Sequence, residues 1–161
     1  MSPGILKACG IKTLAGTLVM KAGCLLDTNV LSELVKPEPN PGVTDKIKRF
    51  EDRIATASIV WHELLYGYHR LSESKKRDLL GEFLFEALLP TVPILPYEDL
   101  AAKWHAHERA RLSAMGKRPG FADGQIAAVS TANNLTLVTN NIKDFEMFQG
   151  LDLENWHEQS T

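Results

Sequence analysis

The chain has 161 residues, of which 44% are hydrophobic and 24% charged, and its formal net charge is -2 with a pI near 6.2. A chain of this length is long enough for one domain that buries on the order of 70% of its unfolded surface. The composition is near the average of globular proteins and therefore argues against intrinsic disorder, and no apolar run approaches the length of a membrane-spanning helix. The net charge neither supports nor excludes a nucleic acid as partner.

The two cysteines give information about the compartment. Cys9 and Cys24 form no CxxC pair and no zinc-ligand spacing, and Cys24 lies inside a predicted strand. This usage favours a reduced, cytoplasmic protein over a disulfide-bonded one.

The first part of the chain differs from the rest. Lysines interrupt any apolar core that a signal peptide would need, so export is not expected. We predict that residues 1–22 form an N-terminal extension that is either not native or not ordered, and that translation starts at Met1 or at Met20. An ordered additional segment is the alternative. Residues 23–157 are predicted to form the folded domain.

An apolar run that stops at Asp27, directly before a helical pattern, is the most informative stretch. Cys24 to Leu26 are predicted to form a strand buried on both faces, and Val30, Leu31 and Leu34 recur at helical spacing. Asp27 is thus placed at the carboxyl end of a strand, which is the edge where open parallel α/β sheets bind ligands. We expect it to hold a cation there, and capping of the following helix is the alternative role.

Strands and helices are predicted to alternate along the remaining chain. Pro90 is expected to end the helix before it, Ser58 to cap the helix after it, and Pro93 to place its strand at a sheet edge. The pattern predicts an α/β fold with a parallel sheet. The predicted strands are residues 54–57, 91–95, 135–139 and 152–156, and the predicted helices after the first are 41–50, 59–68, 73–89, 99–115 and 121–129.

Four acidic residues accompany these apolar elements, namely Asp27, Glu63, Asp123 and Asp144. In a doubly wound sheet the ends of the first and fourth strands can adjoin, which brings distant acids together. Carboxylates ~4 Å apart repel by about 4 kcal/mol per pair at an effective dielectric constant of 20, so a cluster requires protons or cations. Mg²⁺ suits such an oxygen-rich set better than zinc does. For Glu63, a solvated position on its helix is the alternative.

Four segments together resemble one known family in their order and spacing. They are Leu25–Leu34, Glu63–Gly67, Asp123–Ala128 and Leu137–Phe145, and they are similar to the PIN-domain ribonucleases of the VapC toxin type, which belong to type II toxin–antitoxin systems. The resemblance covers residues 24–156. It implies an α/β/α sandwich around a central parallel sheet, RNA hydrolysis that depends on Mg²⁺ or Mn²⁺, a homodimer, and a cognate VapB-type antitoxin.

The resemblance also assigns roles to individual acids. Asp27, Glu63 and Asp123 match the acidic triad of the family, with Asp27 and Asp123 expected as direct metal ligands and Glu63 as a further ligand or as the residue that positions a water molecule. The fourth position is often acidic in the family and is Asn141 here. Either Asp144 serves in its place as the fourth catalytic acid, through a water molecule, or Asn141 itself fills the position.

Polar residues around these acids have weaker expected roles. Thr139, Asn141 and Asn29 are expected to hydrogen-bond to the metal ligands and orient them. Lys117 and Arg118, in the loop before the third acid, are expected to bind RNA phosphates.

Two other functions are compatible with parts of this pattern. A haloacid-dehalogenase-like phosphohydrolase also begins with an apolar strand ending in Asp, but it requires a second Asp two residues later, where this chain has Asn29. A non-catalytic RNA- or protein-binding module on the same fold is the second alternative, and the presence of all three triad acids argues against it.

Overall fold

The computed structural model describes residues 12–14, 17–19 and 23–157. Within these residues, a five-stranded sheet has the order β5-β4-β3-β6-β7, and every pair in it is parallel. The predicted α/β class with a central parallel sheet is therefore confirmed. The strands are β3 (Cys24–Leu26), β4 (Ile54–Ala57), β5 (Ile94–Leu95), β6 (Thr136–Val138) and β7 (Leu153–Glu154).

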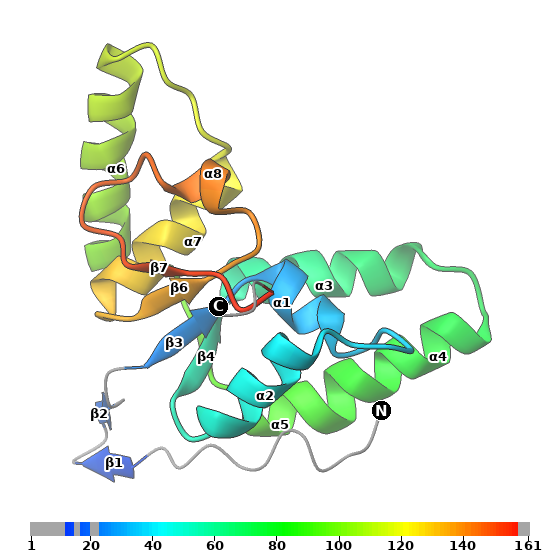
Figure 1. The fold of residues 1–161 in the computed structure, drawn as a ribbon. Helices are drawn as coiled ribbons and strands as arrows, with labels where there is room; N and C mark the ends of the chain where they lie inside the picture. The colour runs from blue at the N-terminus through cyan, green and yellow to red at the C-terminus, as the bar shows by residue number, and fades with distance from the viewer. Residues whose placement is uncertain (1–11, 15–16, 20–22, 158–161) are drawn as a thin grey trace.

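Helices connect the strands and cover the sheet on both sides, with α1 to α5 on one side and α6 to α8 on the other (Figure 1). This arrangement is the expected α/β/α sandwich. The helices are α1 (Thr28–Glu33), α2 (Pro41–Arg49), α3 (Ser58–Arg70), α4 (Lys75–Glu82), the π-helix η1 (Phe83–Leu88), α5 (Leu89–Thr91), α6 (Asp99–Ala114), α7 (Phe121–Ala132) and α8 (Ile142–Phe145).

Strand β3 lies at the centre of the sheet, and its neighbours fix the position of its carboxyl end. Cys24 lies opposite Ile54 on one side and Thr136 on the other, and Leu26 lies opposite Val138. All residues of β3 and β4 are buried, as expected for strands that are covered on both faces. The sheet therefore holds the residue after Leu26 on a rigid base.

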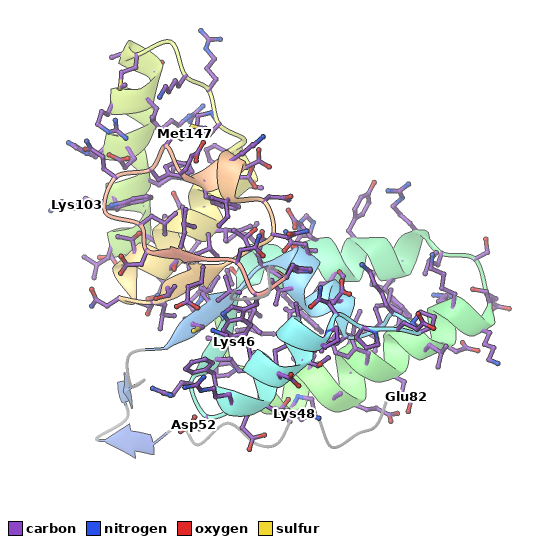
Figure 2. The ribbon with its side chains drawn as sticks, viewed as in Figure 1. Lys46, Lys48, Asp52, Glu82, Lys103 and Met147 are labelled. Carbon is purple, nitrogen blue, oxygen red and sulfur yellow. The ribbon has the colours of Figure 1, made fainter. Side chains whose placement is uncertain are left out.

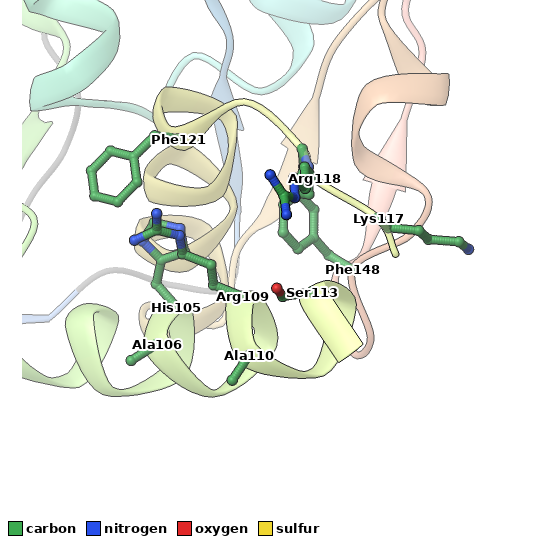
Figure 3. Close-up of a pocket in the computed structure, with 10 residues that line it drawn as sticks. His105, Ala106, Arg109, Ala110, Ser113, Lys117, Arg118, Phe121 and Phe148 are labelled. Atoms are coloured by element: carbon green, nitrogen blue, oxygen red, sulfur yellow. The ribbon is translucent and has the colours of Figure 1, made fainter. Parts of the chain in front are cut away.

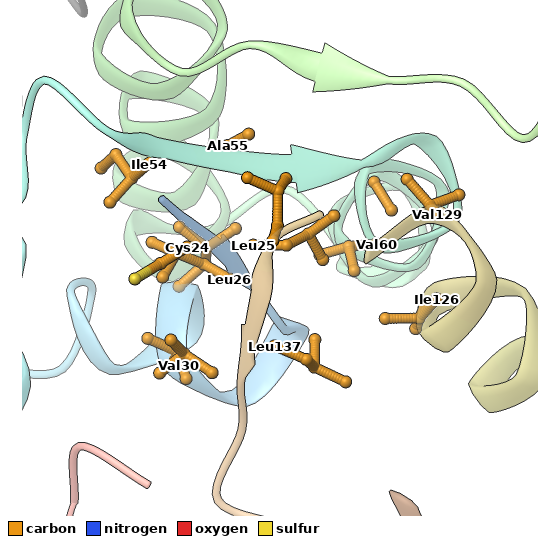
Figure 4. Close-up of a cluster of buried hydrophobic side chains, with 14 of the residues drawn as sticks. Cys24, Leu25, Leu26, Val30, Ile54, Ala55, Val60, Ile126, Val129 and Leu137 are labelled. Atoms are coloured by element: carbon orange, nitrogen blue, oxygen red, sulfur yellow. The ribbon is translucent and has the colours of Figure 1, made fainter. Parts of the chain in front are cut away.

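The hydrophobic core joins the sheet to helices on both of its sides (Figure 4). Leu25 and Leu137 from the sheet, Val60 from α3 and Val129 from α7 have no exposed surface. Truncating such a leucine to alanine typically costs about 2–5 kcal/mol. Charged side chains such as Lys48, Glu82 and Lys103 lie on the outside instead (Figure 2).

Two local predictions are wrong. Pro90 does not end its helix, because the chain widens into the π-helix η1 and places Pro90 in the first turn of α5, where a residue without an N–H group is tolerated. Ser58 does not cap α3, since it is already the first helical residue and the extended Ala57 precedes the helix without a side-chain cap. Pro93 does precede an edge strand, as predicted, although β5 is shorter than the predicted strand.

The N-terminal segment is described only in part. Strands β1 (Lys12–Leu14) and β2 (Thr17–Val19) pair with each other in a separate antiparallel sheet. Met1 and Met20 lie outside the described residues, so the prediction that residues 1–22 are an extension to the domain stays a prediction. Among the helices of the described chain, none has the length and apolar character needed to cross a membrane.

Candidate active site

The candidate site begins where β3 and β6 end side by side. These are the strands between which the order of the sheet reverses, the position at which open α/β sheets bind ligands. The backbone N–H of Asp27 donates to the carbonyl of Val138 at 3.0 Å, and the hydroxyl of Thr139 donates to Asp27 Oδ2 at 2.8 Å. The parallel register thus places Asp27 next to Thr139.

Asp27 is both a helix cap and a site residue. Its Oδ1 accepts from the backbone N–H of Thr28 at 2.8 Å, which makes it the N-cap of α1, while Oδ2 accepts from Thr139 and, at 3.2 Å, from Asn29 Nδ2. Only 5% of the residue is exposed. Burial raises the pKa of Asp27, the hydrogen bonds from Thr139 and Thr28 oppose this shift, and the charge of Glu63 adds to it.

Asn29 and Thr139 connect the loops after the two strands. Asn29 Oδ1 accepts from the backbone N–H of Asn140 at 2.9 Å, and its Nδ2 lies 3.3 Å from Thr139 Oγ1. The backbone N–H of Asn141 also donates to Thr139 Oγ1, at 3.0 Å. Asn29 and Thr139 therefore lie where the sequence predicted, beside Asp27, whereas Asn141 takes part through its backbone and its side chain is exposed.

Glu63 is brought to the site by α3. Its Oε2 accepts a hydrogen bond from the hydroxyl of Thr28, the first residue of α1, so Glu63 does not lie on a fully solvated face of its helix. Thr28 was not predicted to be a site residue. Thr28 directly follows Asp27 in the chain, but Glu63, which accepts its hydrogen bond, lies 35 positions away. Only the packing of α1 on α3 brings Thr28 and Glu63 together.

Asp123 lies in the first turn of α7, against the loop that precedes this helix. A Cβ atom at Gly120 would lie only 2.9 Å from Asp123 Oδ2, so the carboxylate occupies space that a side chain would fill. The pKa of Asp123 is raised to about 6, first by burial and then by the charges of Asp27, Asp144 and Glu63. The charges of the other three predicted acids therefore act on Asp123, and Asp144 contributes from an exposed position on α8.

The charge balance of the site suits a divalent metal ion. In the part of the chain that the structure describes, no basic side chain forms a salt bridge with any of the four acids. No three His, Cys, Asp or Glu side chains among the described residues are close enough together to hold one metal ion. The predicted ligand set of Asp27, Asp123 and Glu63 is therefore not assembled around one position in the described chain. Mg²⁺ usually takes only one or two carboxylates and completes its coordination with water and substrate phosphate.

A pocket of about 530 Å³ lies beside the start of α7 and the loop that precedes it (Figure 3). Lys117 and Arg118 line it, as do Arg109 from α6 and Phe121 from α7. The first two were predicted to bind RNA, and the structure places both near the loop that touches Asp123. Arg109 and Phe121 were not predicted, because their proximity depends on how α6 packs against α7.

Comparisons with known proteins agree with the resemblance found in the sequence. A family model described as PIN domain matches residues 24–149, which include all four acids. Toxin FitB of Neisseria gonorrhoeae is 33% identical over 138 residues, covering 83% of this chain and 99% of that protein. The tRNA(fMet)-specific endonuclease VapC of Shigella flexneri is 30% identical over 132 residues, covering 82% and 96%. The crystal structure of FitAcB from Neisseria gonorrhoeae contains a chain that superposes with a TM-score of 0.76 at 32% identity, covering 84% of this chain and 99% of that one.

Proposed function

This chain belongs to the PIN-domain family, and we propose that it is a metal-dependent endoribonuclease that hydrolyses RNA phosphodiester bonds as the toxin of a toxin–antitoxin pair. The observation that carries the proposal is the position of Asp27 at the edge of the sheet where β3 and β6 end, held by Thr139 and followed by Thr28, which binds Glu63. Among the described residues, none of the predicted acids has a basic side chain as its salt-bridge partner. Relatives named ribonuclease and tRNA(fMet)-specific endonuclease support RNA as the substrate.

The acids have distinct roles in this proposal. Asp27 and Asp123 would hold Mg²⁺ or Mn²⁺, with Glu63 and Asp144 completing the acidic surroundings. Divalent metal ions are the general cofactors of PIN-domain nucleases. When bound, such an ion polarises the phosphodiester and lowers the pKa of the attacking water.

The protein side chains orient the reaction. The hydroxyl of Thr139 and the N–H of Thr28 each donate to one oxygen of Asp27, so the orientation of this carboxylate is fixed before the substrate binds. Glu63 is anchored through Oε2 by Thr28, so its Oε1 can accept a proton from the attacking water. Asn29 and Thr139 keep the two strand-end loops together, and Lys117 and Arg118 attract the phosphates of the strand.

A nuclease assay paired with a phosphatase assay tests this function. The purified chain should cleave single-stranded RNA in Mg²⁺, lose this activity in a chelator, and leave p-nitrophenyl phosphate intact. The comparisons do not favour the haloacid-dehalogenase-like alternative, and hydrolysis of the phosphate ester without RNA cleavage would contradict the nuclease role. Binding of RNA without any cleavage in Mg²⁺ or Mn²⁺ would favour the non-catalytic module.

Exposed apolar side chains support the proposal that this chain binds protein partners. Among the described residues, four of the seven exposed large hydrophobic side chains lie on α3, α4, η1 and α5, which extend together from the sheet (Figure 1); they are Tyr66, Leu79, Phe85 and Leu89. Such groups mark interaction surfaces when they occur together. We assign this side of the molecule to contacts with a VapB-type antitoxin and with a second copy in a homodimer.

Copurification tests the antitoxin. The acidic site lacks a paired basic side chain among the described residues, so an arginine of the antitoxin would pair with its carboxylates and compete with Mg²⁺. This chain should form a stable complex with the product of the neighbouring reading frame, and the complex should cleave RNA more slowly than the free chain. A missing complex, or one with undiminished activity, would contradict the toxin role and leave the nuclease role standing.

A further inference from the structure

The pocket beside the start of α7 is opposite in charge to the acidic site. Arg109, Lys117 and Arg118 contribute three basic side chains to it, and the residues that line it include no Asp or Glu. The chain as a whole carries a net charge of -2, so this concentration of basic groups is local. A basic surface without acids attracts phosphate groups.

The pocket also presents an aromatic ring to solvent. Phe121 is 53% exposed, although burial of a phenylalanine side chain usually stabilises the fold. Its ring is supported by His105, whose ring centroid lies 5.0 Å away, and by Arg109, whose guanidinium carbon lies 5.0 Å from the Phe121 centroid. The ring is therefore held in place while much of it remains accessible.

Hydrogen bonds hold the α6 wall of this pocket in place. His105 is buried, and its Nδ1 lies 3.0 Å from the hydroxyl of Tyr97. Glu108 accepts two hydrogen bonds from Arg111 at 2.8 Å and one from the backbone N–H of Gln149 at 2.9 Å, which ties α6 to the segment that carries Phe148. His105 and the α6 backbone are thus held in place before a ligand binds, whereas Arg109, Lys117 and Arg118 are exposed.

The two sides of the pocket differ in chemistry. Figure 3 shows Phe121 on one side and Arg118 with Phe148 on the other, with Arg109 reaching in from α6. A flat apolar ring suits a nucleobase, and the arginines suit the phosphate attached to it. The volume of about 530 Å³ lies in the range of pockets that hold small ligands.

We propose that this pocket binds one nucleotide of the RNA strand adjacent to the scissile phosphate, with its base stacked on Phe121 and its phosphate between Arg109 and Arg118. The location follows from the loop before α7, since Pro119 lines the pocket and Gly120 touches the carboxylate of Asp123. This inference rests on the proposed ribonuclease function for its substrate. It adds a stacking surface and Arg109 to the residues that contact RNA.

Binding of two labelled strands tests the two contacts separately. One is a fluorescein-labelled oligoadenylate, and the other is the same ribose-phosphate chain without bases. In a chelator, which prevents cleavage, the full-length protein should bind the oligoadenylate about tenfold more tightly than the abasic strand, because base–aromatic stacking contributes on this scale.

Substitutions in the pocket should separate these contacts. Phe121→Leu should remove the preference for the strand with bases and leave the affinity for the abasic strand unchanged, and Phe121→Tyr should restore the preference. Arg109→Gln should lower the affinity for both strands several-fold and reduce the salt dependence of binding by about one phosphate contact. Lys103→Gln is the matched control, because it removes one exposed charge from the same helix outside the pocket, and it should leave the preference intact.

Three results would overturn the inference. They are a base preference that survives Phe121→Leu, an Arg109→Gln variant that binds like Lys103→Gln, and a change of oligomeric state in Phe121→Leu, which would make the pocket an interface between copies. The proposed function fails in a different way. A wild-type chain that shows this binding pattern but cleaves no RNA in Mg²⁺ or Mn²⁺ would contradict the nuclease role and leave the pocket assignment standing.

Discussion

Asp27 and Asp123 have the same carboxylate group but very different surroundings. Asp27 follows a central strand and accepts hydrogen bonds from Thr28, Asn29 and Thr139, which partly offset the effect of burial on its pKa. Asp123 lies on a helix, where burial and the neighbouring acids all raise its pKa and no hydrogen bond among the described residues opposes them. The strand end thus provides an oriented ligand, and the helix provides a charge that lacks compensation.

The two carboxylates therefore have different roles, orientation of the ligand at Asp27 and attraction of a cation at Asp123. The hydrogen bonds to Asp27 offset part of the cost of burying its charge, and their donors belong to the strand-end loops. An uncompensated carboxylate destabilises the metal-free protein and therefore favours whatever cation neutralises it. Substitutions at or beside Asp27 and Asp123 test the two roles separately.

The largest expected effect is the loss of RNA cleavage in Asp27→Asn and in Asp123→Asn. Each substitution removes a ligand charge, so activity in Mg²⁺ should fall by more than about a hundredfold while the circular dichroism spectrum stays native. The control is Glu82→Gln, which removes an exposed carboxylate from α4 and should keep full activity. Full activity of either site variant would contradict the assignment of the metal ligands.

A smaller loss of activity is expected when the support of Asp27 is removed. Thr139→Val replaces the hydroxyl that donates to Asp27 and accepts from the N–H of Asn141, so metal-dependent cleavage should fall about 10–100-fold. Thr139→Ser retains the hydroxyl and should retain most of the activity. If the valine and serine variants were equally active, the orientation of Asp27 would not depend on this bond.

The stability of the metal-free protein should distinguish the two acids. The pKa of Asp123 is raised from 3.8 to about 6, so the unfavourable contribution of this residue to folding is absent below about pH 4 and complete above about pH 6. In a chelator at pH 7, Asp123→Asn should raise the free energy of unfolding by about 1 kcal/mol, a figure reduced for solvent screening of this half-buried group.

The pH dependence provides the control for this measurement. The difference between wild type and Asp123→Asn should shrink as the pH falls from 7 to 4, because Asp123 becomes protonated in the folded state. Asp27→Asn should raise the free energy of unfolding by less than Asp123→Asn does, since the amide of Asn loses part of the hydrogen bonding that the carboxylate of Asp27 receives. A stability difference that does not change with pH in urea titrations would contradict the proposed repulsion at Asp123.

The strand-end residues could be predicted from sequence because their chemistry is local. An apolar run that ends in Asp27 places this side chain at the sheet edge, and the run before Thr139 does the same for the neighbouring strand. The register of β3 and β6 then brings the two together. Spacing along the chain is sufficient here, since parallel strands align their carboxyl ends.

Contacts between helices could not be predicted in the same way. Thr28 meets Glu63 only because α1 packs on α3, and Arg109 meets Phe121 only because α6 packs on α7. Neither pair has a spacing that marks it in the sequence. The π-helix η1 was missed for a similar reason, because Pro90 usually ends a helix and is tolerated here only by a local widening of the turn.

The smallest expected effect is that of removing residues 1–19. Strands β1 and β2 form a two-stranded sheet of their own, and such a hairpin contributes little stability by itself. The central sheet begins with Cys24, which pairs with Ile54 and Thr136 and needs no strand before it. The truncated chain should therefore melt within about 2 °C of the full chain and cleave RNA at the same rate. Because Asp27 and Asp123 both lie outside the deleted segment, a large drop in melting temperature would show that this segment belongs to the core, while a loss of cleavage at unchanged stability would place it in contact with RNA.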